Sequence, residues 1–196
     1  MRVLVACEFS GTVRDAFIRR GHDAISCDLL PTDIPGPHYQ GNVLDILDQN
    51  WDLMIAHPPC TYLAASGLHW NTRVPGRQLE TDKAISFVRT LLNSPIEKIA
   101  LENPIGCIST KIRKPDQIIQ PWWFGEDASK ATCLWLKNLP LLQKTNPLLK
   151  SRYANQTPTG QNKLGPSPDR WKLRSITYQG IALAMANQWT VDPHTF

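Results

Sequence analysis

A cysteine placed directly after two prolines is the side chain of this sequence best suited to covalent chemistry. The segment reads His57-Pro58-Pro59-Cys60 and follows a short apolar run. Proline fixes φ and supplies no amide donor, so Pro59 holds Cys60 in a defined direction. A cysteine attacks as its thiolate, which requires a cation or a helix N-terminus nearby. Cys60 is therefore a candidate nucleophile, because a purely structural cysteine needs no such rigid approach.

A glutamate and an asparagine, Glu102-Asn103, end another apolar run, which follows after one loop and one helix. Such a crossover joins parallel strands, so we expect Cys60 and Glu102 to meet over one pocket. Burial raises the pKa of a carboxyl group, and we expect Glu102 to hold a proton near neutral pH. A thiolate that adds to C6 of a pyrimidine, with an acid that protonates N3, makes C5 nucleophilic enough to accept a methyl group. The alternative is a buried cysteine and a capping glutamate.

Two earlier strand ends also carry useful groups. The turn at Phe9-Ser10-Gly11 lets the backbone approach a ligand closely, and the helix that follows should offer free amide hydrogens. The full G-x-G-x-x-G pattern is missing, which argues against a dinucleotide site. Asp28, at the end of the second apolar run, is placed to bind two ribose hydroxyls. The alternative is a simple turn and a surface aspartate.

The elements that must position these residues alternate along the chain. Short apolar runs predict strands, and helical spacing predicts a helix that ends at Gly21 and two later ones. The predicted strands are residues 2–6, 24–27, 52–56, 99–101 and 131–136, the later helices 79–92 and 181–189, and the main loops 31–41, 61–78 and 151–170. This alternation predicts an α/β fold with a mostly parallel sheet, helices on both faces, and ligands beyond the carboxyl ends of the strands. We expect one domain, 1–196.

Composition narrows the class of protein further. The chain has 196 residues, a formal net charge of +4 and five cysteines without a Cys-x-x-Cys pair. The odd count argues against a disulfide framework, and no His/Cys spacing indicates a metal site. No apolar run is long enough for a membrane helix or a signal peptide. We therefore expect a cytoplasmic protein, with no membrane partner.

The order of these motifs resembles that of the DNA cytosine-5 methyltransferases, over about three quarters of the chain. Cys7-Glu8-Phe9-Ser10-Gly11 resembles their Phe-x-Gly motif, and Gly41-Asn42-Val43 resembles their Gly-Asp-Ile segment. Pro58-Pro59-Cys60 with Ser66-Gly67 resembles their catalytic loop, and Arg77-Gln78-Leu79-Glu80 resembles the start of the helix after that loop. Leu101-Glu102-Asn103-Pro104 resembles their Glu-Asn-Val, and Tyr178-Gln179-Gly180 resembles the start of their last motif. The sequence departs from the family at Asp28, where Glu is usual, at Asn42 for Asp, and at Pro104 for Val. Lys130 and Thr132 stand where the family has two arginines.

This resemblance implies a Rossmann-like methyltransferase fold, Cys60 as nucleophile with Pro59 and Asn103 beside it, and Glu102 as the acid at N3. It also implies S-adenosylmethionine as methyl donor. The residues that would hold this cofactor are Phe9, Ser10, Gly11, Thr12, Asp28, Leu29, Asn42, Val43, Pro59 and Gln179.

The partner implied by the resemblance is duplex DNA with a flipped cytosine. Arg73, Arg77, Lys111, Arg113 and Lys130 are candidates for phosphate contacts, and Lys163, Arg170, Lys172 and Arg174 form a second basic group. The family's large target-recognition region is replaced by a short variable segment, 137–170, a compact form typical of phage or mobile-element enzymes.

Several alternatives remain open. The same chemistry on RNA or on a free cytosine nucleotide is one, and a degenerate homologue that only binds DNA or cofactor is another. An amino-group methyltransferase is disfavoured, because Cys60 fills the aromatic position of its motif. Trp122-Trp123-Phe124 could stack on a base or pack in the core.

Overall fold

Seven strands form one sheet in the order β3-β2-β1-β4-β5-β7-β6 in the computed structural model, which describes residues 1–190. The strands are β1 (Arg2–Ala6), β2 (Asp23–Asp28), β3 (His38–Gln40), β4 (Leu53–Ala56), β5 (Lys98–Pro104), β6 (Gln117–Ile119) and β7 (Thr132–Lys137). The pairs from β3 through β5 are parallel, whereas β7 runs antiparallel to both β5 and β6. The predicted α/β, Rossmann-like class with a mostly parallel sheet is confirmed.

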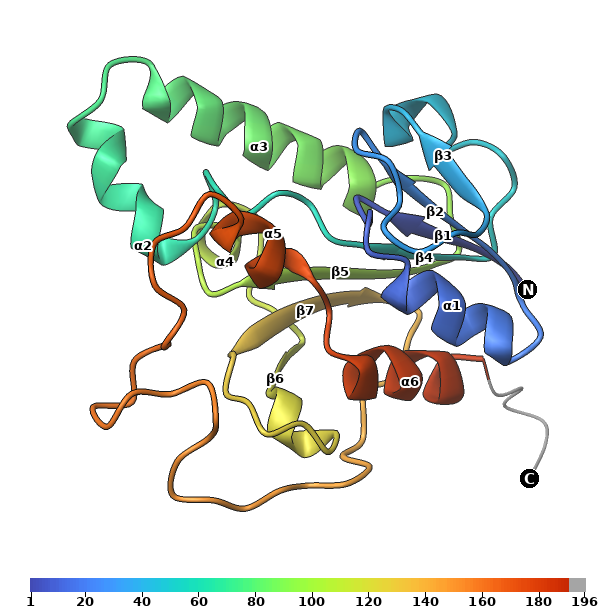
Figure 1. Cartoon of the computed structure of the whole chain (residues 1–196). Coiled ribbons are helices and arrows are strands. Elements are labelled where there is room, and N and C mark those ends of the chain that lie inside the picture. The colour runs from blue at the N-terminus through green and yellow to red at the C-terminus, as the bar shows by residue number, and fades with distance from the viewer. Residues whose placement is uncertain (191–196) are drawn as a thin grey trace.

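Helices cover both faces of this sheet (Figure 1). The main helices are α1 (Thr12–Arg19), α3 (Arg77–Leu92) and α6 (Gln179–Gln188), and the shorter ones are α2 (Ala65–Leu68), α4 (Ile108–Lys111) and α5 (Arg170–Ser175). On one face, α1 and α6 pack on Val3, Val5 and Ile55. On the other, α3 packs on Leu4, Met54 and Ile99, so each β strand buries alternate side chains in two separate cores.

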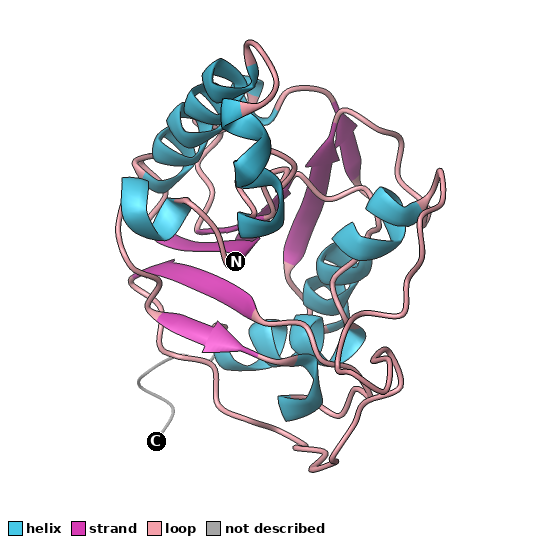
Figure 2. Cartoon of the chain, turned by 90° about the vertical axis from the view of Figure 1, so that its left-hand side faces the viewer, coloured by secondary structure: helices cyan, strands magenta, loops and turns pink. Residues whose placement is uncertain are grey.

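The central strands lie close to their predicted bounds, because buried parallel strands read as continuous apolar runs. The short elements were missed. β3 lies inside the loop predicted at 31–41, α2 lies inside the one predicted at 61–78, and β6, α4 and α5 were not predicted. The stretch from 138 to 169 has no helix or long strand, and Figure 2 shows how much of the chain past β7 is loop.

Within residues 1–190, no helix combines the length and the apolar character that crossing a membrane requires.

Candidate active site

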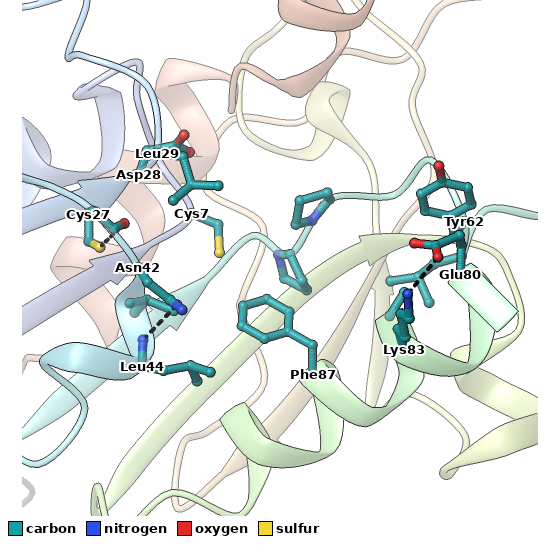
Figure 3. Close-up of a pocket in the computed structure, with 16 residues that line it drawn as sticks. Cys7, Cys27, Asp28, Leu29, Asn42, Leu44, Tyr62, Glu80, Lys83 and Phe87 are labelled. Atoms are coloured by element: carbon teal, nitrogen blue, oxygen red, sulfur yellow. Dashed lines mark hydrogen bonds and ion pairs between the residues drawn. The ribbon is translucent and has the colours of Figure 1, made fainter.

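A cavity of about 440 Å³ lies at the carboxyl ends of β1, β2 and β4 (Figure 3). Ligands bind at this edge in open α/β sheets. Five of the predicted cofactor residues line the cavity: Asp28, Leu29, Asn42, Val43 and Pro59. Its other walls include Phe87, which points inward from α3, and Tyr62 from the loop after Cys60. Three of the predicted cofactor segments, at Asp28, Asn42 and Pro59, thus meet in one cavity.

Asp28 and Asn42 are polar groups at the β2 end of this cavity, and the Glu80–Lys83 pair of α3 lies at its other end (Figure 3). Asp28 accepts a hydrogen bond from the Leu30 amide at 2.9 Å through Oδ1, which leaves Oδ2 for a ligand. Burial raises the pKa of Asp28, although the Leu30 amide and His38 oppose that shift. Asn42 uses its Oδ1 to accept the Leu44 amide at 3.1 Å, so its Nδ2 is the group left for an adenine. An acidic group for ribose, an amide donor and an apolar slot fit S-adenosylmethionine.

The Phe9-Ser10-Gly11-Thr12 turn lies outside the residues that line this cavity. The prediction of free amides at the start of α1 is wrong, because the buried Glu8 side chain already accepts hydrogen bonds from two of them. Glu8 takes the amide of Val13 at 2.7 Å and that of Arg14 at 3.2 Å. Ser10 accepts the Thr12 amide at 3.3 Å. A cofactor at this edge therefore cannot use the α1 amides unless Glu8 moves.

The outer side of this turn is also covered by protein. The Phe9 ring lies 6.1 Å from the Trp171 ring of α5, and Lys172 pairs with Asp33 at 2.7 Å. Gln179, predicted to reach the cofactor, is an exposed residue at the start of α6 and does not line the cavity. The structure therefore brings only some of the predicted cofactor residues together in the cavity.

Cys60 is the exposed cysteine of the chain, at the rim next to the cavity residue Pro59. Its loop begins a tight turn, in which the Cys60 carbonyl accepts the amides of Leu63 and Ala64 at 3.0 and 2.9 Å. Burial raises the pKa of Cys7, Cys27, Cys107 and Cys133, which keeps those four thiols neutral. Exposure thus singles out Cys60 as the thiol available for attack.

The Cys60 loop is fastened to the segment that follows Glu102. The Asn103 side chain donates to the Pro58 carbonyl at 2.7 Å, and the Cys107 amide donates to the Leu63 carbonyl at 2.9 Å. Gly106 permits this approach, because an added Cβ would lie 1.9 Å from the Leu63 oxygen. Since β4 and β5 are adjacent and parallel, these bonds hold the nucleophile and the carboxyl group at one strand edge.

Glu102 is paired with His57, the residue directly before Pro58. His57 Nδ1 lies 2.8 Å from Glu102 Oε2, and the two side chains are 10% and 11% exposed. Burial acts to raise the pKa of Glu102, but the hydrogen bond and charge of His57, with smaller effects from Lys130 and Thr177, lower it overall. The predicted raised pKa is therefore wrong, and Glu102 is ionised at rest.

The five predicted phosphate-binding residues occupy different surroundings. Lys130 lies close enough to Glu102 to lower its pKa, and its Nζ donates to the Arg174 carbonyl at 2.8 Å. Arg77 is tied to the Cys60 loop through the Thr61 carbonyl at 3.0 Å. Arg113 pairs with Asp116 at 2.8 Å, Arg73 lies over the Trp70 ring, and Lys111 is exposed on α4. The structure therefore brings Lys130 and Arg77 to the site.

The aromatic run after β6 belongs to the packing of the chain. Phe124 is buried in the core, and Trp123 packs against it. The Trp122 ring stacks on the Tyr153 ring at 5.9 Å between centroids, which fixes the variable segment to the domain. No group of three or more His, Cys, Asp or Glu side chains within residues 1–190 is arranged to hold a metal ion.

Sequence reasoning missed several residues that shape the site. Glu8 caps α1, Gly106 admits the loop, and Phe87 closes the cavity. The signal for Glu8 was its place five residues before Val13, at a helix start, where acidic side chains are stabilising. No signal in the sequence marked Gly106, because its role depends on a contact between distant segments.

Comparison with known proteins gives matches among solved structures only. No protein-family model matches the chain, and no curated protein does. Among solved structures, the chain is similar to the 16S rRNA methylase RmtB, with 14% sequence identity and a TM-score of 0.35. The match covers 69% of this chain and 54% of that one, so the chain spans about half the length of that protein.

Proposed function

We propose that this chain transfers a methyl group from S-adenosylmethionine to carbon 5 of cytosine in DNA, with Cys60 as nucleophile. The observation that carries the proposal is the fastening of the exposed Cys60 loop, through Asn103 and Cys107, to the strand that carries Glu102. The cofactor-sized cavity opens at the same edge, with Pro59 in its wall. The motif order of the cytosine-5 methyltransferases supports the same assignment.

The chemistry follows from these two side chains. The Cys60 thiolate adds to C6 of cytosine, and the C5–C6 double bond shifts to C4–C5 as N3 takes a proton from Glu102. C5 becomes nucleophilic and accepts the methyl group that bound S-adenosylmethionine supplies as an electrophile. A water molecule takes the C5 proton, the C5–C6 double bond re-forms as the Cys60 thiolate leaves C6, and return of the N3 proton to Glu102 restores the aromatic ring.

His57 sets the protonation of the acid in this scheme. Glu102 is ionised at rest, so it must take up one proton before or as the base binds. Its Oε2 is engaged by His57, and Thr177 also hydrogen-bonds the carboxyl group, so a bound base must share Glu102 with these two side chains. Methyl transfer is therefore expected to slow as the pH rises and the protonated fraction of Glu102 falls.

DNA is the proposed substrate, and a base in DNA must leave the stack before a thiol can reach its C6 atom. Lys130 and Arg77 beside the site, with a net charge of +4, suit a phosphate backbone. A recognition segment as short as 137–170 predicts low sequence specificity.

The experiment is methyl transfer from labelled S-adenosylmethionine to duplex DNA, single-stranded DNA, RNA and cytidine nucleotides, with the product base identified. We expect 5-methylcytosine in DNA, and loss of transfer in Cys60→Ser. Cys107→Ala, which removes a buried thiol, is the matched control and should remain active. Transfer only to RNA or to free nucleotides would contradict the DNA assignment, and undiminished transfer by Cys60→Ser would contradict the nucleophile.

A further inference from the structure

A second cavity, of about 480 Å³, lies next to Glu102 and shares no lining residue with the first. Pro104, two residues after Glu102 on β5, forms part of its floor, and Tyr178 follows the Thr177 that hydrogen-bonds Glu102. Two strand residues span about 7 Å. The second cavity is therefore adjacent to Glu102 and separate from the first cavity.

Asn155, Asn162 and Leu164 of the variable segment form part of the walls of this second cavity, and these walls are firmly held. Asn155 accepts the Ser129 amide and donates to the Ser129 carbonyl, both at 2.9 Å. The Lys163 amide donates to the Asn155 carbonyl at 2.9 Å, and Lys130 Nζ reaches the Arg174 carbonyl at 2.8 Å. The cavity is thus formed before any ligand arrives, which lowers the cost of binding.

The lining of the second cavity combines three kinds of group. Lys130 and Arg174 supply positive charge, Asn162 supplies an amide, and Leu173 and Ile176 supply apolar surface. Cations bind phosphate, apolar side chains cover the face of a base, and amides bind its edge. The volume is that of a small-ligand site and leaves no room for a base pair held in a duplex.

We propose that the second cavity binds one unpaired nucleotide that adjoins the target cytosine in the same strand, with its phosphate at Lys130 and Arg174. This inference rests on the proposed function, because Glu102 marks the position of the target base. The short variable segment then does not read several base pairs of a duplex. It holds a single neighbouring nucleotide, so the substrate must be unpaired at two successive positions.

The test uses single-stranded oligonucleotides that carry one cytosine, with an abasic residue either next to it or four positions away. We expect the adjacent abasic residue to weaken binding about tenfold, and the distant one to have little effect. In Arg174→Met the intact oligonucleotide should bind about tenfold more weakly, and the slope of log affinity against log salt should fall by about 0.7, the value for one lost phosphate contact on a single strand. Arg152→Met removes an exposed cation of the variable segment that does not line the cavity, and should change neither the affinity nor the salt slope.

A crosslink separates this inference from the proposed function, because it requires no methyl transfer. An oligonucleotide with 5-bromouracil next to the cytosine should crosslink, on irradiation, to peptides that contain Tyr178 or residues 153–164. Such a crosslink supports the cavity assignment even if no methyl group is transferred, an outcome that would contradict the methyltransferase proposal alone. Methyl transfer without the crosslink, or equal effects of Arg174→Met and Arg152→Met, would overturn the cavity assignment.

Discussion

Replacement of His57 by phenylalanine tests the buried pair at the centre of the site. The change keeps a ring of similar size but removes the donor that lies 2.8 Å from Glu102. Removing one partner of a buried pair leaves the other buried and charged, which costs about 3–5 kcal/mol of folding free energy. Both side chains are about 90% buried, so solvent screening reduces this figure little. We expect the free energy of unfolding at pH 8 to fall by about 3 kcal/mol.

The sign of the pH dependence distinguishes a lost ion pair from lost packing. In the native protein the pKa of Glu102 is lowered, so the stability it contributes is present above the unfolded carboxyl pKa and disappears as the pH falls through the folded value. In His57→Phe burial still raises the pKa of Glu102, while the two effects of His57 that lowered it are gone. Glu102 then destabilises the variant at pH 8 and less so at pH 5, where a larger fraction of it is protonated.

Urea unfolding at pH 5 and pH 8 measures this difference. A loss of about 3 kcal/mol moves the midpoint by about 1–2 M at typical slopes, and the shift should be smaller at pH 5. The free energy of unfolding of His57→Gln, whose side-chain amide can still donate a hydrogen bond, should lie between those of the native protein and His57→Phe. Lys83→Gln breaks an exposed helix pair and should cost about 0.3 kcal/mol at either pH. An equal destabilisation of His57→Phe at both values would refute the ion-pair reasoning.

Three further substitutions probe other parts of the site. Asp28→Asn replaces the carboxylate oxygen left for the ribose by an amide NH2 that cannot accept a hydrogen bond, and should weaken S-adenosylmethionine binding about tenfold by calorimetry, with little change in stability. Glu8→Ala removes the cap from the Val13 amide and should lower the free energy of unfolding by about 1–2 kcal/mol in urea titration. Gly106→Ala places a methyl group against the Leu63 oxygen and should abolish methyl transfer, while near-UV circular dichroism shows a folded core. Wild-type behaviour of any of the three would contradict the role given to that residue.

The central sheet was predictable because its strands are buried on both faces and read as apolar runs. β1, β4 and β5 therefore lie near their predicted positions, and the strand ends bring Cys60 and Glu102 to one edge. The short elements β3 and β6 have three residues each, too few for any periodic signal to stand out. Their place depends on neighbouring strands and not on their own sequence.

The site was only partly predictable for a related reason. Residue type indicated Asp28 as a cavity residue, and the Pro-Pro-Cys spacing indicated an exposed nucleophile. The pKa of Glu102 depends on a contact with His57 across two strands, and local sequence does not reveal such a contact. The amides of Val13 and Arg14 at the start of α1 are occupied because the Glu8 side chain, from the turn before the helix, accepts hydrogen bonds from both.

Covalent trapping is the measurement that tests the central claim most directly. A DNA strand with 5-fluorocytosine at the target position cannot lose a proton from C5, so the bond between Cys60 and C6 should persist after methyl transfer. The account predicts a stable adduct that requires S-adenosylmethionine, with the DNA attached to the peptide that contains Cys60, and no adduct with Cys60→Ser. Transfer of methyl groups to ordinary cytosine DNA without any adduct on the fluorinated strand, or an adduct at another cysteine, would contradict it.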